Sequence, residues 1–159
     1  MPSHSKPLGI EDESGFAFAQ EMLAGDRTFG INFDRVQWDR TRGRYAIVEF
    51  LRCREEQFAR GVTPHTSHPN RYWDLNAQKF VALWKIAQAL GADLWLVNYC
   101  EKGLAHDDEV RVMFVTGVDP DASERDEAGK PNRVRTINKA MTRAEFSRWY
   151  RAFNRRGDV

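Results

Sequence analysis

The chain has 159 residues, a formal net charge of +1 and 42% hydrophobic residues, which is the composition of an ordinary globular protein. A single domain of this length can bury a core without disulfides or structural metals. No apolar run approaches the roughly 18 residues that a membrane span needs, and the N-terminus lacks the apolar segment of a signal peptide. We therefore expect a cytoplasmic protein with no membrane partner.

Charge is divided unevenly along the chain. From residue 130 to the end there are nine Lys and Arg residues against two acidic ones, a local charge of +7, which leaves −6 for the rest of a chain whose total is +1. A segment this basic favours a polyanionic partner despite the near-neutral total.

The N-terminal part predicts a tail and a short helix. Residues 1–12 contain two prolines and an acidic run, and we expect them to form a flexible tail. The next stretch, ESGFAFAQEMLAG, has apolar side chains on a broad face, Ser14 as a candidate N-cap and Gly25 as a stop. It predicts a helix that carries Glu21 as an interior acid.

A tight β-hairpin is predicted for residues 29–53, with its turn between Asp39 and Gly43. It carries two acids among strand-forming residues, Asp34 in the first arm and Glu49 in the second. An ionised carboxylate in such surroundings is costly unless something binds it. Acids on adjacent strands that face the same way can share a cation, and Mg²⁺ or Mn²⁺ prefers oxygen ligands of this kind. These two acids therefore predict a divalent metal site.

The middle of the chain predicts a right-handed βαβ unit. A long polar loop leaves the hairpin, and apolar residues then recur at helical spacing from Asp74 until Gly91 ends the helix. The apolar run Leu94–Cys100 follows as a short strand. Because a helix separates this strand from the second arm of the hairpin, we expect the two strands to pair in parallel.

The last third predicts a strand over residues 110–118, a flexible acidic-to-basic connection over residues 119–141, and a basic helix over residues 142–159 that begins at Thr142 and packs on the core. With residues 13–118 as the core, the predicted fold class is α/β, a mixed four-stranded central sheet flanked by helices with an additional C-terminal helix.

This succession of elements resembles the core of the PD-(D/E)XK nuclease superfamily, which includes restriction endonucleases and Holliday-junction resolvases. The likeness covers roughly residues 14–118, from the acid-bearing helix through the two acidic strands to the crossover helix and its strand. It implies a restriction-endonuclease-like sheet, a nuclease that depends on Mg²⁺ or Mn²⁺, and a nucleic-acid partner, with DNA favoured over RNA. Folds of this kind often act as homodimers or within larger complexes.

The resemblance also implies residue roles. Asp34 and Glu49 would be the catalytic metal ligands and Glu21 an assisting acid. The lysine of the family lies two residues after the glutamate, where this chain has Leu51. In some branches the lysine has moved to the following helix, which makes Lys79 the candidate that orients the attacking water or stabilises developing charge. Without a lysine at the site, the domain would be an inactive nuclease fold that binds nucleic acid or a protein partner.

Loop and helix residues add candidate contacts. We expect His65, His68 and Arg71 in the loop after the hairpin to contact nucleic acid. A zinc site that joins the two histidines to Cys53 and Cys100 is a weaker alternative, because its spacing matches no familiar site and the cysteines are expected to be buried free thiols.

The C-terminal helix places aromatic residues on one side and arginines on the other. Arg148, Arg151 and Arg155 are expected to attract nucleic-acid phosphates, the alternative being a solvated face above a packed aromatic one. Arginines also supply the alternative for the two hairpin acids, which would then be plain ion pairs in a structural protein. The candidates for that pairing are Arg35, Arg44 and Arg52.

Overall fold

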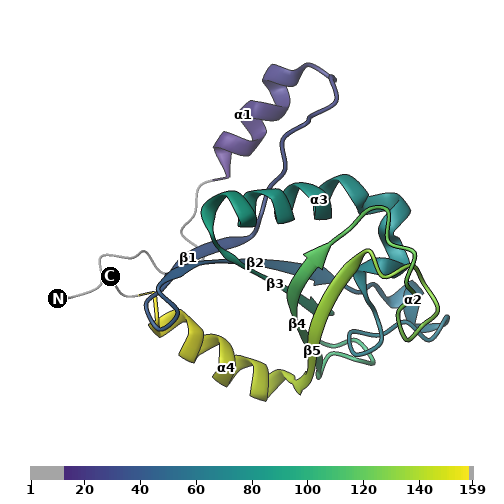
Figure 1. The fold of residues 1–159 in the computed structure, drawn as a ribbon. Coiled ribbons are helices and arrows are strands. Elements are labelled where there is room, and N and C mark those ends of the chain that lie inside the picture. Colours follow the sequence, from purple (N-terminus) through teal and green to yellow (C-terminus); the bar gives the residue numbers. More distant parts are fainter. Residues whose placement is uncertain (1–12, 158–159) are drawn as a thin grey trace. The chain divides into compact units, whose positions relative to one another are not determined.

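The computed structural model describes residues 13–157, and these fall into two compact units, residues 13–32 and residues 33–157 (Figure 1). The predicted tail, residues 1–12, lies outside the described residues. No helix of the described part is long and apolar enough to cross a membrane.

The first unit contains helix α1, Ser14–Leu23. The predicted helix is confirmed, although Glu13 rather than Ser14 occupies its N-cap and Ala24 rather than Gly25 takes the left-handed conformation at its C-cap. No residue of α1 is buried, and Phe16 and Phe18 are 58% and 60% exposed.

The second unit is built on a mixed five-stranded sheet with the order β1-β2-β3-β4-β5. The strands are β1 (Arg35–Asp39), β2 (Arg44–Arg52), β3 (Asp93–Tyr99), β4 (Glu109–Val118) and β5 (Val134–Thr142), and the helices are α2 (Glu55–Phe58), the 3₁₀ helix η1 (Pro69–Tyr72), α3 (Trp73–Leu90) and α4 (Arg143–Arg155). Strands β2 and β3 are parallel and joined through α3, which confirms the βαβ prediction, and the other neighbouring strands are antiparallel.

The predicted count of four strands is wrong, because residues 134–141, expected in a flexible connection, belong to β5. This strand pairs with β4 from Val134 opposite Val118 to Thr142 opposite Glu109. Among its residues Val134 and Met141 alone are buried, so the alternation of apolar and polar residues that marks a half-buried strand is nearly absent. Pairing with β4 compensates for this weak pattern.

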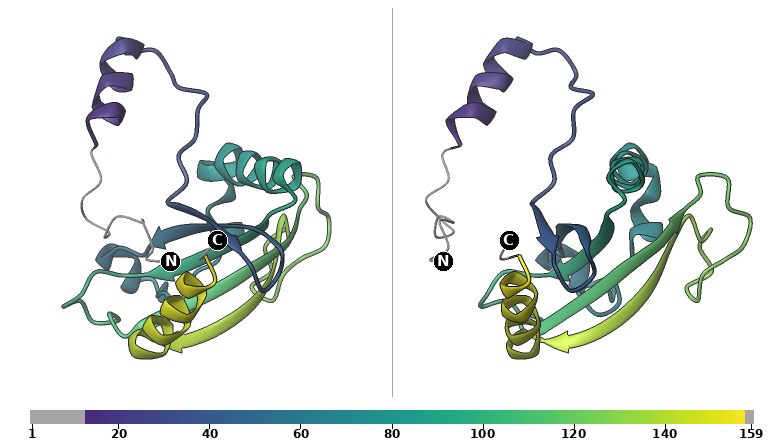
Figure 2. Two further views of the ribbon diagram at one scale, coloured as in Figure 1. Left: turned by 90° about the vertical axis from the view of Figure 1, so that its left-hand side faces the viewer. Right: turned by 60° about the vertical axis from the view of Figure 1, so that its left-hand side comes forward.

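The two long helices of this unit cover opposite faces of the sheet, as Figure 2 shows for α3 and α4. Successive side chains of a strand point to opposite faces. On β2, Val48 belongs to a core cluster with Phe153 of α4, whereas the next residue, Glu49, is paired with a side chain of α3. The α3 face of β2 therefore carries the buried acid.

Helix α4 is fixed by its cap and by its aromatic face. Thr142 and Glu145 form the capping box, with the Glu145 amide 3.1 Å from the Thr142 hydroxyl. Phe146 stacks with Tyr150, and both contact Phe50 of β2 edge to face. The predicted C-terminal helix is confirmed, and its aromatic side is a packing surface.

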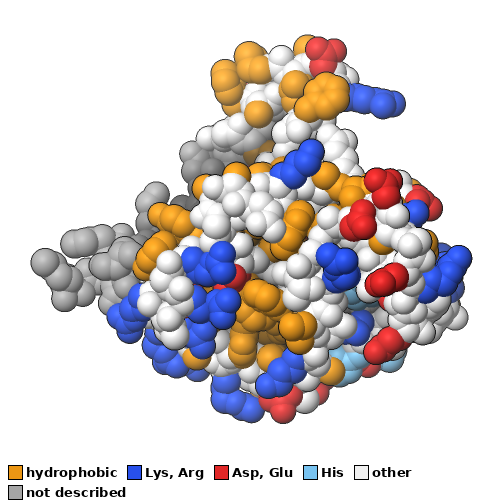
Figure 3. Space-filling view, viewed as in Figure 1, with side chains coloured by type: hydrophobic (Ala, Val, Ile, Leu, Met, Phe, Trp, Pro, Cys, Tyr) orange, Lys and Arg blue, Asp and Glu red, His pale blue; other side chains and the backbone are white. Residues whose placement is uncertain are grey.

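A hollow of about 330 Å³ interrupts the surface between α4 and the edge of the sheet. Its wall is mainly apolar and includes Trp95, Phe114, Ile137 and Trp149. Figure 3 shows hydrophobic side chains over this region, bordered by Lys and Arg side chains.

Candidate functional site

Asp34 and Glu49 meet at the end of the β1–β2 hairpin. Arg35 is opposite Val48 in the antiparallel register, which places Asp34, the residue just before β1, opposite Glu49. The Asp34 amide donates to Glu49 Oε2 at 3.1 Å, and the Phe50 amide donates to Asp34 Oδ2 at 2.8 Å. Each carboxylate thus accepts a hydrogen bond from a backbone amide at, or next to, the other acid. Asp34 is exposed, whereas Glu49 is 3% exposed.

Lys79 reaches this pair from α3. Its ammonium forms a salt bridge with Glu49 Oε1, so both oxygens of Glu49 have a donor. The Lys79 side chain is 36% exposed, and it therefore connects a buried carboxylate to solvent. The structure brings together three of the residues that the sequence singled out, from the approach to β1, from β2 and from α3.

The electrostatics of Glu49 combine opposing influences. Burial raises the pKa of Glu49 above its ordinary value, the hydrogen bond and charge of Lys79 lower it, and the negative charge of Asp34 raises it again. Burial outweighs the lysine, so the pKa ends above the ordinary value. A carboxylate in this position is stabilised by any cation that approaches it.

Two of the arginines predicted as alternative partners of Asp34 and Glu49 form salt bridges with other acids. Arg44 pairs with Asp93 at 3.3 Å, and Arg52 pairs with Glu101 at 2.6 Å. Glu49 is held by a lysine instead. The pair still has a purely structural interpretation, in which Lys79 neutralises an acid that the fold has buried.

The donor set of Asp34 and Glu49 fits a hard divalent cation. Mg²⁺ sites commonly use one or two protein carboxylates and leave the remaining positions to water and substrate. A carboxylate oxygen that accepts one hydrogen bond keeps a second lone pair. Within residues 13–157 no three His, Cys, Asp or Glu side chains group as metal ligands, so a cation here would rely on these two acids.

No protein-family profile, curated protein or solved structure matches the chain. Residue roles at this site therefore rest on its geometry.

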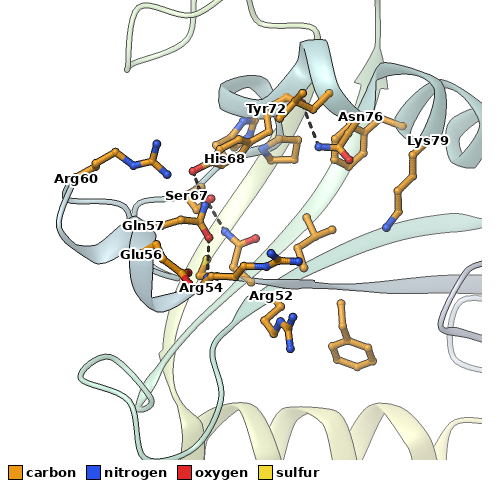
Figure 4. Close-up of a pocket in the computed structure, with 17 residues that line it drawn as sticks. Arg52, Arg54, Glu56, Gln57, Arg60, Ser67, His68, Tyr72, Asn76 and Lys79 are labelled. Carbon is orange, nitrogen blue, oxygen red and sulfur yellow. Dashed lines mark hydrogen bonds between the residues drawn. The ribbon is translucent and has the colours of Figure 1, made fainter.

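A cavity of about 720 Å³ opens beside Lys79 (Figure 4). The end of β2, the α2 segment and the first turns of α3 surround it, and Lys79 lines it together with Phe50 and Leu51, the two residues that follow Glu49. Four cationic side chains and one acid lie on its wall, namely Arg52, Arg54, Arg60, Lys79 and Glu56. The site thus adjoins a space with a positive lining.

Arg54 and Arg60 were missed by the sequence interpretation. They flank the four-residue helix α2 in a polar loop. Because the whole loop is polar, its composition does not distinguish residues of a cavity wall from residues of the open surface. The available signal was their place in the loop that follows the strand carrying Glu49.

The loop histidines bind the protein itself. His65 Nε2 lies 2.9 Å from the Met141 carbonyl oxygen, and His68 Nε2 lies 2.9 Å from Thr136 Oγ1. Burial, assisted by the charge of Arg111, lowers the pKa of His68 to about 4, so its ring is neutral at physiological pH. Both rings tie the loop to β5. His68 also lines the cavity, and Arg71 is exposed on η1.

In the part of the chain that the structure describes, no three His, Cys, Asp or Glu side chains lie together as metal ligands, so the alternative zinc site is not present there. Cys53 and Cys100 are buried free cysteines, as predicted. Burial raises the pKa of Cys53 to about 11, which disfavours the thiolate that a metal requires.

The remaining predicted site residues are exposed. Arg148, Arg151 and Arg155 lie on α4 away from its packed aromatic side, so a role in binding phosphates stays a prediction. Glu21 is exposed on α1 in the other unit, and its assisting role also stays a prediction.

Proposed function

We propose that this protein is a metal-dependent nuclease, related in design to the PD-(D/E)XK enzymes, that hydrolyses phosphodiester bonds at the Asp34–Glu49 pair. The observation that carries the proposal is the contact of Lys79 with Glu49. Leu51 occupies the position where the family has its lysine, and α3 supplies an ammonium at the same carboxylate instead.

The residues have distinct roles in this proposal. Asp34 and Glu49 would hold Mg²⁺ or Mn²⁺, which when bound activates water and neutralises charge on a phosphate. Lys79, partly exposed beside the cavity, would donate hydrogen bonds to the attacking water or to the phosphate oxygens. The cationic wall next to it would attract the substrate backbone.

Cleavage assays with matched variants test the proposal. Plasmid, linear duplex and single-stranded DNA and RNA would be incubated with Mg²⁺, Mn²⁺ or EDTA. We expect Glu49→Gln, Asp34→Asn and Lys79→Met each to reduce the cleavage rate by about 10²-fold or more. Lys85→Met, a change at an exposed lysine of the same helix, serves as the control. Cleavage that persists in Glu49→Gln, or that ignores EDTA, would refute the proposal.

One observation favours a second candidate, an inactive nuclease fold that binds nucleic acid or a protein partner. Each Glu49 oxygen already has a donor within the protein, one of them the Lys79 ammonium. A lysine that permanently replaces a metal ion would give this arrangement. Retention of nucleic acid without cleavage under any metal condition would support this candidate over the first.

A further inference from the structure

The cavity beside Lys79 is lined by two arginines that form no salt bridge within the described residues 13–157. Within residues 13–157, Arg52 is paired with Glu101 and Lys79 with Glu49, but neither Arg54 nor Arg60 forms a salt bridge. Both are exposed. A cavity wall with two guanidinium groups that form no ion pair within residues 13–157 favours an anionic ligand, and the planar guanidinium fork matches the geometry of a phosphate.

Gln57 holds this part of the wall in place. Its side-chain oxygen accepts the Arg54 amide hydrogen at 2.7 Å, and its side-chain nitrogen donates to the Tyr72 hydroxyl oxygen. One side chain thus links the backbone of Arg54 to Tyr72, another residue of the cavity wall. Side chains ordered before a ligand arrives lose less conformational entropy on binding.

Another part of the wall is apolar and aromatic. Tyr72, Leu75 and Phe80 of η1 and α3 line it, and Leu75 is 83% exposed at the start of the helix. Aromatic side chains provide stacking surfaces for nucleobases in proteins that bind single strands. The cavity therefore pairs a surface for a base with cations for a phosphate.

The size of the cavity indicates what form the nucleic acid takes. Its volume of about 720 Å³ falls within the range of small-ligand sites, roughly 300–1,000 Å³. A base within a duplex is paired and stacked, and it must be extruded before it can enter such a space. A single strand presents its bases without this cost.

We propose that this cavity binds one nucleotide of a single-stranded nucleic acid, with its neighbouring backbone phosphates on Arg54 and Arg60 and the base against Tyr72. Figure 4 shows Arg60 and Lys79 on opposite sides of the cavity. A strand held in this way passes from the arginines towards Lys79 and the two acids. The inference rests on the proposed function for its ligand, a nucleic-acid strand, and does not require cleavage.

Fluorescence anisotropy in EDTA tests binding without cleavage. The probes are a short single-stranded oligonucleotide, as DNA and as RNA, and a duplex of the same DNA sequence. We expect the protein to bind a single strand more tightly than the duplex, and Arg54→Ala and Arg60→Ala each to weaken that binding about tenfold. Each variant should also lower the salt dependence of log Kd by about 0.7. Arg40→Ala, at an exposed arginine in the β1–β2 turn, should bind as the original chain does.

Competition identifies the bound unit. Thymidine 5′-monophosphate should displace the oligonucleotide, and thymidine without the phosphate should not. Equal binding of duplex and single strand, no binding of either, or unchanged affinity in both arginine variants would overturn the inference. A protein that binds single strands through these arginines and cuts nothing would refute the nuclease and leave this inference standing. Cleavage that proceeds unchanged in both arginine variants would refute this inference and leave the proposed nuclease standing.

Discussion

Removing Lys79 tests the central ion pair through folding stability, independently of any activity. Loss of one partner from a fully buried pair costs roughly 3–5 kcal/mol, because it leaves an unpaired charge in the interior. Glu49 is 4% exposed at its side chain, but Lys79 is 36% exposed and solvent reaches its end of the pair. We therefore expect Lys79→Met to lower the free energy of unfolding by about 2 kcal/mol at neutral pH.

The loss should depend on pH with a defined sign. Burial raises the pKa of Glu49 and Lys79 opposes this, so the pKa rises further in Lys79→Met. The folded variant then retains its proton to a higher pH than the unfolded chain, whose glutamate titrates near its ordinary value of 4.5. Stability consequently falls as the pH rises from that value through the folded pKa. The destabilisation should be small near pH 4.5 and complete above the folded pKa.

Urea denaturation at several pH values measures this effect. Lys85→Met controls for the loss of a helix lysine, and Glu49→Gln removes the charge that Lys79 neutralises. On the Glu49→Gln background, Lys79→Met should cost less than about 0.5 kcal/mol, because no charge remains to be paired. An equal cost on both backgrounds, or a cost that does not change between acidic and neutral pH, would show that Lys79 does not neutralise the buried charge of Glu49.

Three further predictions concern the frame around the site. Phe153→Ala should destabilise the protein by about 3–5 kcal/mol in urea denaturation, because this 2% exposed ring fills the core between α4 and the sheet. As the pH falls from 6.5 to about 4, the unfolded chain binds a proton at His68 and the folded chain does not, so the protein should lose stability over this range. His68→Asn should abolish this loss, and unfolding curves across the range measure it. Asn70→Ala should cost about 2 kcal/mol and speed amide exchange at Val134, because the Asn70 side chain bonds both the amide and the carbonyl of that residue.

Local sequence signals made most of the fold predictable. The apolar spacing of α3, the hairpin turn and the cap at Thr142 each specify an element locally, and all three are present. Strand β5 was missed because its pattern is not local. It is an edge strand with few buried side chains, and its place depends on pairing with β4 and on the loop residues His65, His68 and Asn70, which bind it from distant positions.

The acids and the lysine of the site could be named from the sequence, but their contacts could not. Register determines that Asp34 lies opposite Glu49, and one residue of slip would point Glu49 to the α4 face. The cavity was not predictable, because it is bounded by an irregular loop. Arg54 and Arg60 are distinguished from other surface arginines by what surrounds them, and a sequence pattern does not carry that information.

The position of Lys79 ties the fold to the chemistry proposed for it. Side chains at positions 49 and 51 point to the same face of β2 because a strand has a period of two, and α3 covers that face. Leu51 can therefore serve as an apolar wall of the cavity while the ammonium comes from α3. Under the proposed function, the second lone pair of each Glu49 oxygen would remain available to a divalent cation. Lys79 would stay at the carboxylate, and its partly exposed ammonium would be available to a phosphate in the adjoining cavity.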